Sequence, residues 1–352
     1  MKQLLKTDLR RYFTNPLLWI AVLIALLFGA ELGFNTIRNS NTYFMLDDFY
    51  PLLLLFALAA VLALLISSQH KDGIFRSKII AGHRKSTVFL AELFAAMLVS
   101  AMLPAAFFLP VLLLSGKTLS NLPQAQLRLG IAAIFLVFLA FAALYVLFGI
   151  SSRSRLAAAA CCAGAAFLLY ALNYYCNDAL HAPERYVINL VYTDNDRREC
   201  YSSSAGQTIT LPKDSGICWN ADGILVGRDG QPVNFDGVTL EEGADPIRHD
   251  IPHPKYVGGP MRAVLIVCDS LNPVRPLPAA CSVFHYSAEE QNTPDDTGDT
   301  DDIGGIGDIG MSAAQYRAAQ YELLRKYLPW QLGGIAVFSL LGMLLFRRKE
   351  LN

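Results

Sequence analysis

Ionisable side chains are nearly absent from six long stretches of this sequence, although the whole chain carries 29 Lys and Arg and 30 Asp and Glu. These apolar stretches are residues 17–33, 50–68, 87–114, 129–150, 156–174 and 330–346. A carrier driven by protons or sodium needs carboxylates within the membrane, each costing roughly 2.5–3.5 kcal/mol at the bilayer centre. Glu31 and Arg128 lie near outer ends of the stretches, and Glu92 lies about one and a half turns inside the inner end of stretch 87–114. This scarcity argues against such a carrier.

The same stretches have the length needed to cross a membrane. A hydrocarbon core of about 30 Å requires roughly 20 apolar residues in a helix, because lipid offers the backbone no other hydrogen-bond partners. Stretch 330–346 is short and contains Gln331 and two adjacent glycines, so its outer boundary is open. Stretch 87–114 contains Pro104 and Pro110, which should kink the helix or end it early. The predicted fold is a mostly α, polytopic membrane protein with six transmembrane helices.

The charges are divided unevenly along the chain. The net charge of −1 indicates no nucleic-acid partner, yet residues 175–328 carry 12 Lys and Arg against 23 Asp and Glu. Fourteen basic residues flank the spans on the side of the N-terminus, against Arg38, Lys117 and Arg128 in the short loops opposite. By the positive-inside rule, both termini are expected in the cytoplasm and the acidic block outside.

The N-terminal segment before the first apolar stretch is basic. Phe28 stands where a signal-peptide cleavage site needs a small residue, so the stretch is interpreted as a retained helix. Residues 1–16 are predicted to form an interfacial helix that turns into the membrane at Asn15 and Pro16. Its characteristic side chains are Leu5, Leu9, Arg10, Arg11, Tyr12 and Phe13. The alternative is a basic flank that only fixes topology.

Residues 175–328 are long enough for a domain of their own. The segments YVINLVYTD and QTITL are typical of strands, and GILVGRDGQPVNF predicts a hairpin turning at Asp229 and Gly230. MRAVLIVCDSL fits a buried strand or a helix equally well. Residues 291–310 have the composition of a flexible acidic linker. We therefore expect an α+β extracytoplasmic domain between the fifth and sixth spans.

Motifs for catalysis or metal binding are incomplete. SGKT at residues 115–118 ends like a phosphate-binding loop, but Val111 stands where that motif requires glycine. The linker carboxylates match no calcium-site spacing, and the His249, Asp250 and His253 group lacks a second pair of ligands. The sequence predicts no catalytic, cofactor-binding or metal site in this chain.

Five of the 7 cysteines lie in the segment expected outside. Oxidising surroundings would permit disulfides. The pairs Cys200–Cys218 and Cys268–Cys281 would close the shortest loops, and Cys176 would then remain unpaired. The connectivity stays open. In the fifth span, Ala160 and Gly164 have the spacing of a close helix contact, and Cys161 and Cys162 are interpreted as packing residues.

A small basic island, GIFRSKIIAGHRKST, separates the second and third stretches. We expect a two-turn helix from Gly73 to Ile80, with Phe75 and Ile79 on one face and Gly82 ending it. Ser86 or Thr87 should then cap the third membrane helix. An ordinary positive-inside loop is the alternative.

The island resembles the loop between the second and third helices of bacterial permease subunits of ATP-binding-cassette (ABC) transporters, type-2 export class. The layout is also similar: an N-terminal interfacial helix, six spans, a large insertion before the sixth, and the terminal FRRKELN. LNYYCNDALHAPE and IPHPKYVGGPMRAV are further local similarities, whereas residues 291–310 depart from the pattern.

This resemblance implies a permease in the bacterial cell membrane that exports a substrate and is not itself an enzyme. It implies a separate ABC ATPase using ATP and Mg, a second permease subunit, and a lipid bilayer around both. The residues expected to couple to the ATPase are Gly73, Phe75, Arg76, Lys78, Ile79, Ile80, Gly82, Arg84 and Lys85, with Arg153 and Arg155 as a second contact. Phe75, Ile79 and Ile80 would enter a groove on the ATPase, and the basic side chains would hold the segment at its surface.

The expected organisation has four parts. They are residues 1–16, residues 17–174 with the coupling loop 69–86, residues 175–328, and residues 329–352 with the sixth span and cytoplasmic tail. A rival hypothesis is a polytopic sensor or scaffold whose outer domain binds a ligand. The sequence indicates neither the substrate nor whether the permease is a homodimer or heterodimer.

Overall fold

The computed structural model of the chain describes most of the helical residues and part of the segment between the fifth and sixth spans. The described residues are 2–38, 43–44, 46, 48–152, 154–182, 185–193, 197–202, 207–212, 218–219, 225–226, 247–252, 255–284, 286–287 and 313–348. Between residues 185 and 252 only the backbone is described.

Six helices are long and apolar enough to cross a membrane. They are α2 (Pro16–Arg38), α3 (Phe49–Lys71), α5 (Lys85–Leu119), α6 (Gln124–Ser151), α7 (Arg155–His181) and α11 (Ala313–Arg348). Each contains one of the six predicted stretches, so the prediction of a mostly helical chain with six helices suited to crossing a membrane is confirmed, which is consistent with a multi-pass membrane protein. α11 begins well before residue 330 because AAQYRAAQYELLRKYL is rich in residues with high helix propensity.

The two prolines of α5 do not end the helix early. α5 continues through Pro104 and Pro110 to Leu119, so of the two expected outcomes, a kink or an early end, the early end is wrong. In lipid, an interrupted backbone would leave amide and carbonyl groups without partners, which favours continuing the helix.

Shorter elements complete the chain. The short helices are α1 (Lys2–Thr14), α4 (Ile74–Ile80), α8 (Gly259–Leu271) and α9 (Pro276–Ser282). MRAVLIVCDSL, which fitted a strand or a helix, lies in α8. Two-residue pairs are formed by β1 (Tyr43–Phe44) with β8 (Tyr286–Ser287), and by β5 (Cys218–Trp219) with β6 (Leu225–Val226).

An antiparallel sheet has the order β4-β3-β2-β7. Its strands are β2 (Arg185–Thr193), β3 (Arg197–Ser202), β4 (Gln207–Pro212) and β7 (Ile247–Pro252). Leu190 is opposite Cys200, and Val187 is opposite Asp250. The two segments expected as strands, YVINLVYTD and QTITL, lie in β2 and β4. The expected hairpin turn at Asp229 and Gly230 and the linker 291–310 lie outside the described residues.

The chain divides into two compact units. One comprises Met1–Tyr174, Cys268–Gly298 and Ala313–Asn352, and the other Tyr175–Val267 and Asp299–Ser312. The expected outer segment 175–328 is thus shared between the units, since α9 packs against α6 and α11 in the helical unit. The second unit contains the four-stranded sheet.

Close helix packing in the helical unit depends on α2 rather than α7. A Cβ added at Gly29 would lie 2.1 Å from the Phe107 carbonyl oxygen of α5, and one at Gly33 would lie 2.7 Å from Leu114. A Cβ at Gly164 would meet nothing within 4 Å, so the expected close contact at this glycine of α7 does not form within the described chain. Glycine is required where the α2 and α5 backbones touch.

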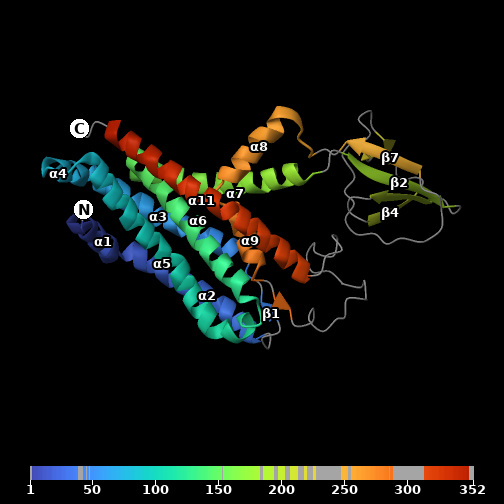
Figure 1. Cartoon of the computed structure of the whole chain (residues 1–352), viewed down its shortest axis with the longest axis horizontal. Coiled ribbons are helices and arrows are strands. Elements are labelled where there is room, and N and C mark those ends of the chain that lie inside the picture. Colours follow the sequence, from blue (N-terminus) through green and yellow to red (C-terminus); the bar gives the residue numbers. More distant parts are fainter. Residues whose placement is uncertain are drawn as a thin grey trace. The chain divides into compact units, whose positions relative to one another are not determined.

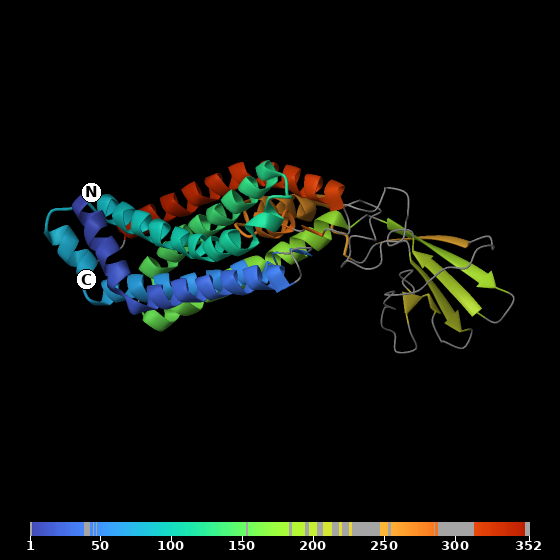
Figure 2. The ribbon, with the colours of Figure 1, turned by 90° about the horizontal axis from the view of Figure 1, so that it is seen from below.

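The two ends of the chain lie at one end of the helical unit, together with α1 and α4 (Figures 1 and 2). The Phe75 ring of α4 lies 5.6 Å from the Phe346 ring of α11, centroid to centroid. Lys85 Nζ donates a hydrogen bond to the Arg347 carbonyl oxygen at 3.2 Å. The N-terminal helix, the loop between α3 and α5, and the last turn of α11 therefore lie together at one end of the bundle, which we call the α1–α4 end.

Candidate functional site

The basic island forms the short helix α4 between two glycines. Gly73 precedes Ile74 with φ 68°, and Gly82 follows Ala81 with φ 90°. Backbones with positive φ favour glycine, which has no Cβ to clash with the carbonyl. The Gly82 amide donates to the Ile79 carbonyl oxygen at 2.9 Å. The predicted two-turn helix ending at Gly82 is confirmed.

The third membrane helix begins differently from the prediction. α5 starts at Lys85, its N-cap is Arg84, and no side chain caps it. The amides of Thr87 and Val88 instead donate to the Arg84 carbonyl oxygen at 3.0 and 3.1 Å. The expected caps at Ser86 or Thr87 are wrong because both residues are already inside the helix.

Phe75 points into the bundle. Its side chain is 1% exposed, between Phe346 of α11 and the Lys78 ammonium, which lies 5.4 Å from the ring centroid. Ile79 is partly buried against the same core. The expectation that Phe75 enters a groove on a partner is therefore wrong. Residues three apart share a helix face, and this face of α4 covers the end of the bundle.

Lys78 also points inward, although it was expected at a partner's surface. The side chain is 8% exposed, and its Nζ lies 2.6 Å from Asp8 Oδ1 of α1 and 3.9 Å from Glu92 Oε2 of α5. Both carboxylates are fully buried. Because an ammonium buried in apolar surroundings needs an opposite charge, Lys78 holds α4 to α1 and α5.

Glu92 collects hydrogen bonds from two further elements. Tyr12 Oη of α1 donates to Glu92 Oε1 at 2.7 Å, and Gln69 Nε2 of α3 donates to the same oxygen at 2.9 Å. Burial raises the pKa of Tyr12 well above its usual value, and the neighbouring Glu92 raises this pKa further. The phenol consequently remains a hydrogen-bond donor at physiological pH.

These side chains form one connected group, which we call the buried polar cluster. Its members are Asp8, Tyr12, Gln69, Lys78 and Glu92. It contains two carboxylates and one ammonium, and Arg11 Nη1 lies 4.0 Å from Asp8 Oδ1 at its edge. Separating buried charges of this kind is costly. A displacement of α4 therefore has to carry α1 and α5 with it.

The side of α4 and of the following turn that faces away from the buried polar cluster is exposed. Its side chains are Arg76, Ser77, Ile80 and Arg84, which we call the α4 surface. Ile80 is 75% exposed, and Arg76 and Arg84 lie four residues before and after it in the sequence. A groove of about 420 Å³ runs between α1 and α4, lined in part by Thr7, Ser77 and Ala81. Of the expected coupling residues, Arg76, Ile80, Gly82 and Arg84 are accessible, and Phe75 and Lys78 are not.

The second predicted contact lies beside the first. Arg155 Nη2, at the start of α7, is 3.9 Å from Asp72 Oδ1 in the turn before α4. Arg153 lies outside the described residues. Arg155, at the end of the loop between α6 and α7, thus lies next to the loop that contains α4.

The N-terminal helix packs one stripe of side chains against the bundle, and of the expected residues only Tyr12 belongs to this stripe. Leu4, Asp8 and Tyr12, each four residues apart, are buried, whereas Leu5 and Leu9 are only partly buried. Phe13 and Arg10 are exposed. Asn15 Oδ1 accepts from the Leu17 amide at 2.9 Å, so the predicted turn at Asn15 and Pro16 is confirmed. The missed signal was a single acid, Asp8, on the same helical stripe as Leu4 and Tyr12.

The predicted cysteine pairs are only partly described. Cys268 is a free thiol in α8, so the Cys268–Cys281 disulfide is not formed. Cys281 is instead buried in α9 as part of the apolar core. The side chains of Cys200 and Cys218, like those of His249, Asp250 and His253, lie outside the described residues. Within the described residues, no group of three or more His, Cys, Asp or Glu is placed to hold a metal ion.

Comparisons of the chain with protein-family models, curated proteins and solved structures find no match. The functional interpretation therefore depends on the geometry at the α1–α4 end. That geometry is a short helix with one face fixed to the bundle through buried charges and the other face exposed.

Proposed function

We propose that the chain is the membrane permease subunit of an ATP-driven ABC exporter and that α4 receives the movement of a separate ATPase. The observation that carries this proposal is the contrast between the two faces of α4. Phe75 and Lys78 attach it to the bundle, and Arg76, Ser77 and Ile80 remain exposed. A loop that served only to fix topology would need basic residues, but no buried attachments.

The inward contacts suit the transmission of force. Lys78 reaches Asp8 of α1 and Glu92 of α5, and Phe75 packs on Phe346 of α11. A displacement of α4 would consequently act on an N-terminal helix and two membrane-spanning helices together. Packed elements of this kind move as rigid bodies because their interiors are dense and resist deformation.

The α4 surface has the composition of a small protein interface. Ile80 supplies an exposed apolar contact, and Arg76 and Arg84 lie on either side of it in the sequence. Interface cores combine apolar side chains with arginine, and guanidinium groups favour carboxylates. We therefore expect an apolar pocket bordered by acidic residues on the ATPase.

The remaining parts of the proposal concern placement and partners. We place both termini in the cytoplasm of a bacterial cell and assign the four-stranded sheet to an α+β extracytoplasmic domain. Six spans and the shared end of α1, α4 and the last turn of α11 are consistent with this topology. ATP and Mg would be bound by the partner ATPase, and two permease subunits would form the export path.

A co-purification experiment tests the coupling role. The full-length chain is expressed with the ATPase encoded beside it, carrying Ile80→Asp or Arg76→Glu. Lys6→Glu is the matched control, because Lys6 is exposed on α1 and does not line the groove. We expect the α4 variants to weaken complex formation and stimulated ATP hydrolysis about tenfold, as interface anchors do, with no effect of the control.

Unchanged complex formation and ATP hydrolysis in both α4 variants would refute the coupling role. The lack of any neighbouring ATPase gene, together with an adjacent kinase or regulator, would favour the rival sensor or scaffold. Topology is tested separately with Ser77→Cys. Labelling of this exposed position by an impermeant thiol reagent outside intact cells would overturn the cytoplasmic placement of α4.

A further inference from the structure

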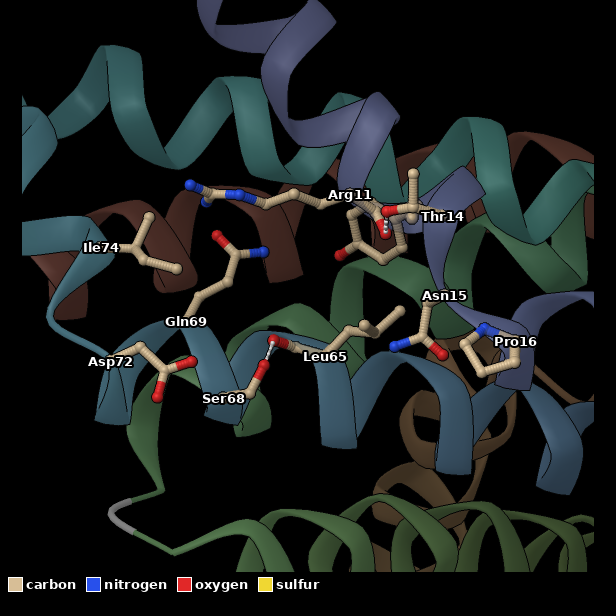
Figure 3. Close-up of a pocket in the computed structure, with 10 residues that line it drawn as sticks. Arg11, Thr14, Asn15, Pro16, Leu65, Ser68, Gln69, Asp72 and Ile74 are labelled. Atoms are coloured by element: carbon tan, nitrogen blue, oxygen red, sulfur yellow. Dashed lines mark hydrogen bonds between the residues drawn. The ribbon is translucent and has the colours of Figure 1, made fainter.

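A cavity of about 280 Å³ lies where α1 meets α2, against α3. Figure 3 shows its polar lining: Arg11 reaches from α1 over the Gln69 amide of α3, and Asp72 lies at the end of α3. Leu65 and Pro16 add apolar walls. At roughly 30 Å³ for each water-sized group, the space accommodates a small polar headgroup.

Two residues of this cavity each have one buried polar atom without a hydrogen-bond partner within the described chain. Gln69 is 4% exposed, and its Oε1 accepts no hydrogen bond, although its Nε2 donates to Glu92. Arg11 Nη1 is also buried without a hydrogen bond, since Asp8 is 4.0 Å away. Buried polar groups are normally satisfied. The unsatisfied Gln69 oxygen and the partly exposed Arg11 guanidinium beside the same cavity indicate a ligand that carries the complementary groups.

The charges of the lining define the ligand class. Arg11 supplies one positive charge and Asp72 one negative charge, so the cavity suits neither a simple anion nor a simple cation. A guanidinium group binds phosphate, and a carboxylate with an amide oxygen accepts from an ammonium. Arg155 Nη2 lies 3.9 Å from Asp72 Oδ1, beyond hydrogen-bond distance, so Asp72 retains capacity as an acceptor.

The position of the cavity matches the level of lipid headgroups. Asn15 and Pro16 line it at the point where α1 ends and membrane-spanning α2 begins. Trp19 and Phe13 flank this turn with exposed rings, and Trp19 Nε1 donates to the Phe13 carbonyl oxygen at 2.8 Å. Amphipathic aromatic side chains gather at membrane–water interfaces.

We propose that this cavity binds the headgroup of phosphatidylethanolamine, with the phosphate on Arg11 and the ammonium on Asp72 and Gln69 Oε1. Phosphatidylcholine has no N–H donor for these oxygens, and phosphatidylglycerol has no cation. The bound lipid would join α1 to α3 beside the buried polar cluster. This inference does not depend on the proposed export function.

The test is lipid binding to the delipidated full-length chain, followed by native mass spectrometry. Phosphatidylethanolamine, phosphatidylcholine and phosphatidylglycerol with identical acyl chains are titrated separately. We expect phosphatidylethanolamine to bind about tenfold more tightly than the other two, and Arg11→Gln to remove that advantage. Arg10→Gln is the matched control, because Arg10 is exposed on the same helix and does not line the cavity.

A second variant keeps the test decisive if Arg11→Gln fails to fold. Asp72 is 54% exposed, and Asp72→Asn should lose the preference for phosphatidylethanolamine over phosphatidylglycerol. Equal binding of the three lipids, or equal losses in the Arg10 and Arg11 variants, would overturn the proposal. Displacement of the lipid by an equal concentration of soluble phosphoethanolamine would assign the site to a free metabolite and overturn the lipid assignment.

Discussion

The buried polar cluster around Lys78 differs from a second group of buried charges around Arg275. Arg275 Nε lies 3.0 Å from Asp269 Oδ2, and its guanidinium group lies 5.0 Å from the centroid of the Tyr327 ring. Between them in sequence, Asn272 Nδ2 donates to the Leu169 carbonyl oxygen at 2.8 Å. Both groups place ionised side chains inside the helical unit, but they connect different kinds of elements.

The ion pair of the Arg275 group joins neighbouring parts of the chain, and contacts with Tyr327 of α11 and Leu169 of α7 hold the group against other helices. Asp269 lies in the last turn of α8 and Arg275 precedes α9, so their ion pair fixes the turn between two successive helices. Lys78 and Asp8 are 70 residues apart, and Tyr12 and Glu92 are 80 apart. The first arrangement stabilises a local turn, whereas the second determines how α4 is attached to the bundle. The second lies next to the exposed α4 surface.

The largest predicted effect is that of Lys78→Met. This change leaves two buried carboxylates without their ammonium, and we expect a loss of about 5 kcal/mol, the upper range for one broken buried pair. The measurement is thermal unfolding in detergent. Arg76→Met, on the exposed side of α4, is the control and should change stability by less than about 0.5 kcal/mol. Similar losses for both variants would contradict the inward position of Lys78.

Arg275→Met is expected to have the next largest effect. It leaves a single carboxylate, Asp269, without its cation, so we expect a loss of about 3 kcal/mol, the lower end for a broken buried pair. Because this group fixes a local turn, binding of the proposed ATPase at a permissive temperature should be unchanged. Lys78→Met should weaken that binding as well. Loss of ATPase binding in both variants would remove the distinction between the two groups.

The smallest effect concerns two tyrosines. Tyr12→Phe removes a 2.7 Å hydrogen bond to Glu92 and should cost about 1.5 kcal/mol, as for bonds to charged acceptors. Tyr327→Phe removes a 3.5 Å contact with Asp269, which is at the geometric limit, and should cost less than about 0.5 kcal/mol. Equal shifts in thermal midpoint for the two variants would show that Tyr12 is not a specific part of its cluster.

The membrane helices and the limits of α4 follow from local sequence. An apolar stretch in lipid has to be helical over its whole length, which explains why α5 continues through Pro104 and Pro110. Gly73 and Gly82 limit α4 because few other residues tolerate a positive φ. The faces of α4 were less predictable. Periodicity placed Phe75 and Ile79 on one face, but it did not indicate whether that face packs on the bundle or on a partner.

By itself, the sequence determined six helices long and apolar enough to span a membrane, a short helix between two glycines, and a turn at Asn15 and Pro16. These features depend on interactions within a few residues or between the backbone and lipid. Only the tertiary structure decided that Phe75 and Lys78 point inward, that Asp8 and Gln69 join Glu92, and that Ile80 remains exposed. The physical reason is that a buried charge requires a partner, and the partners of Lys78 come from α1 and α5, which only folding brings together.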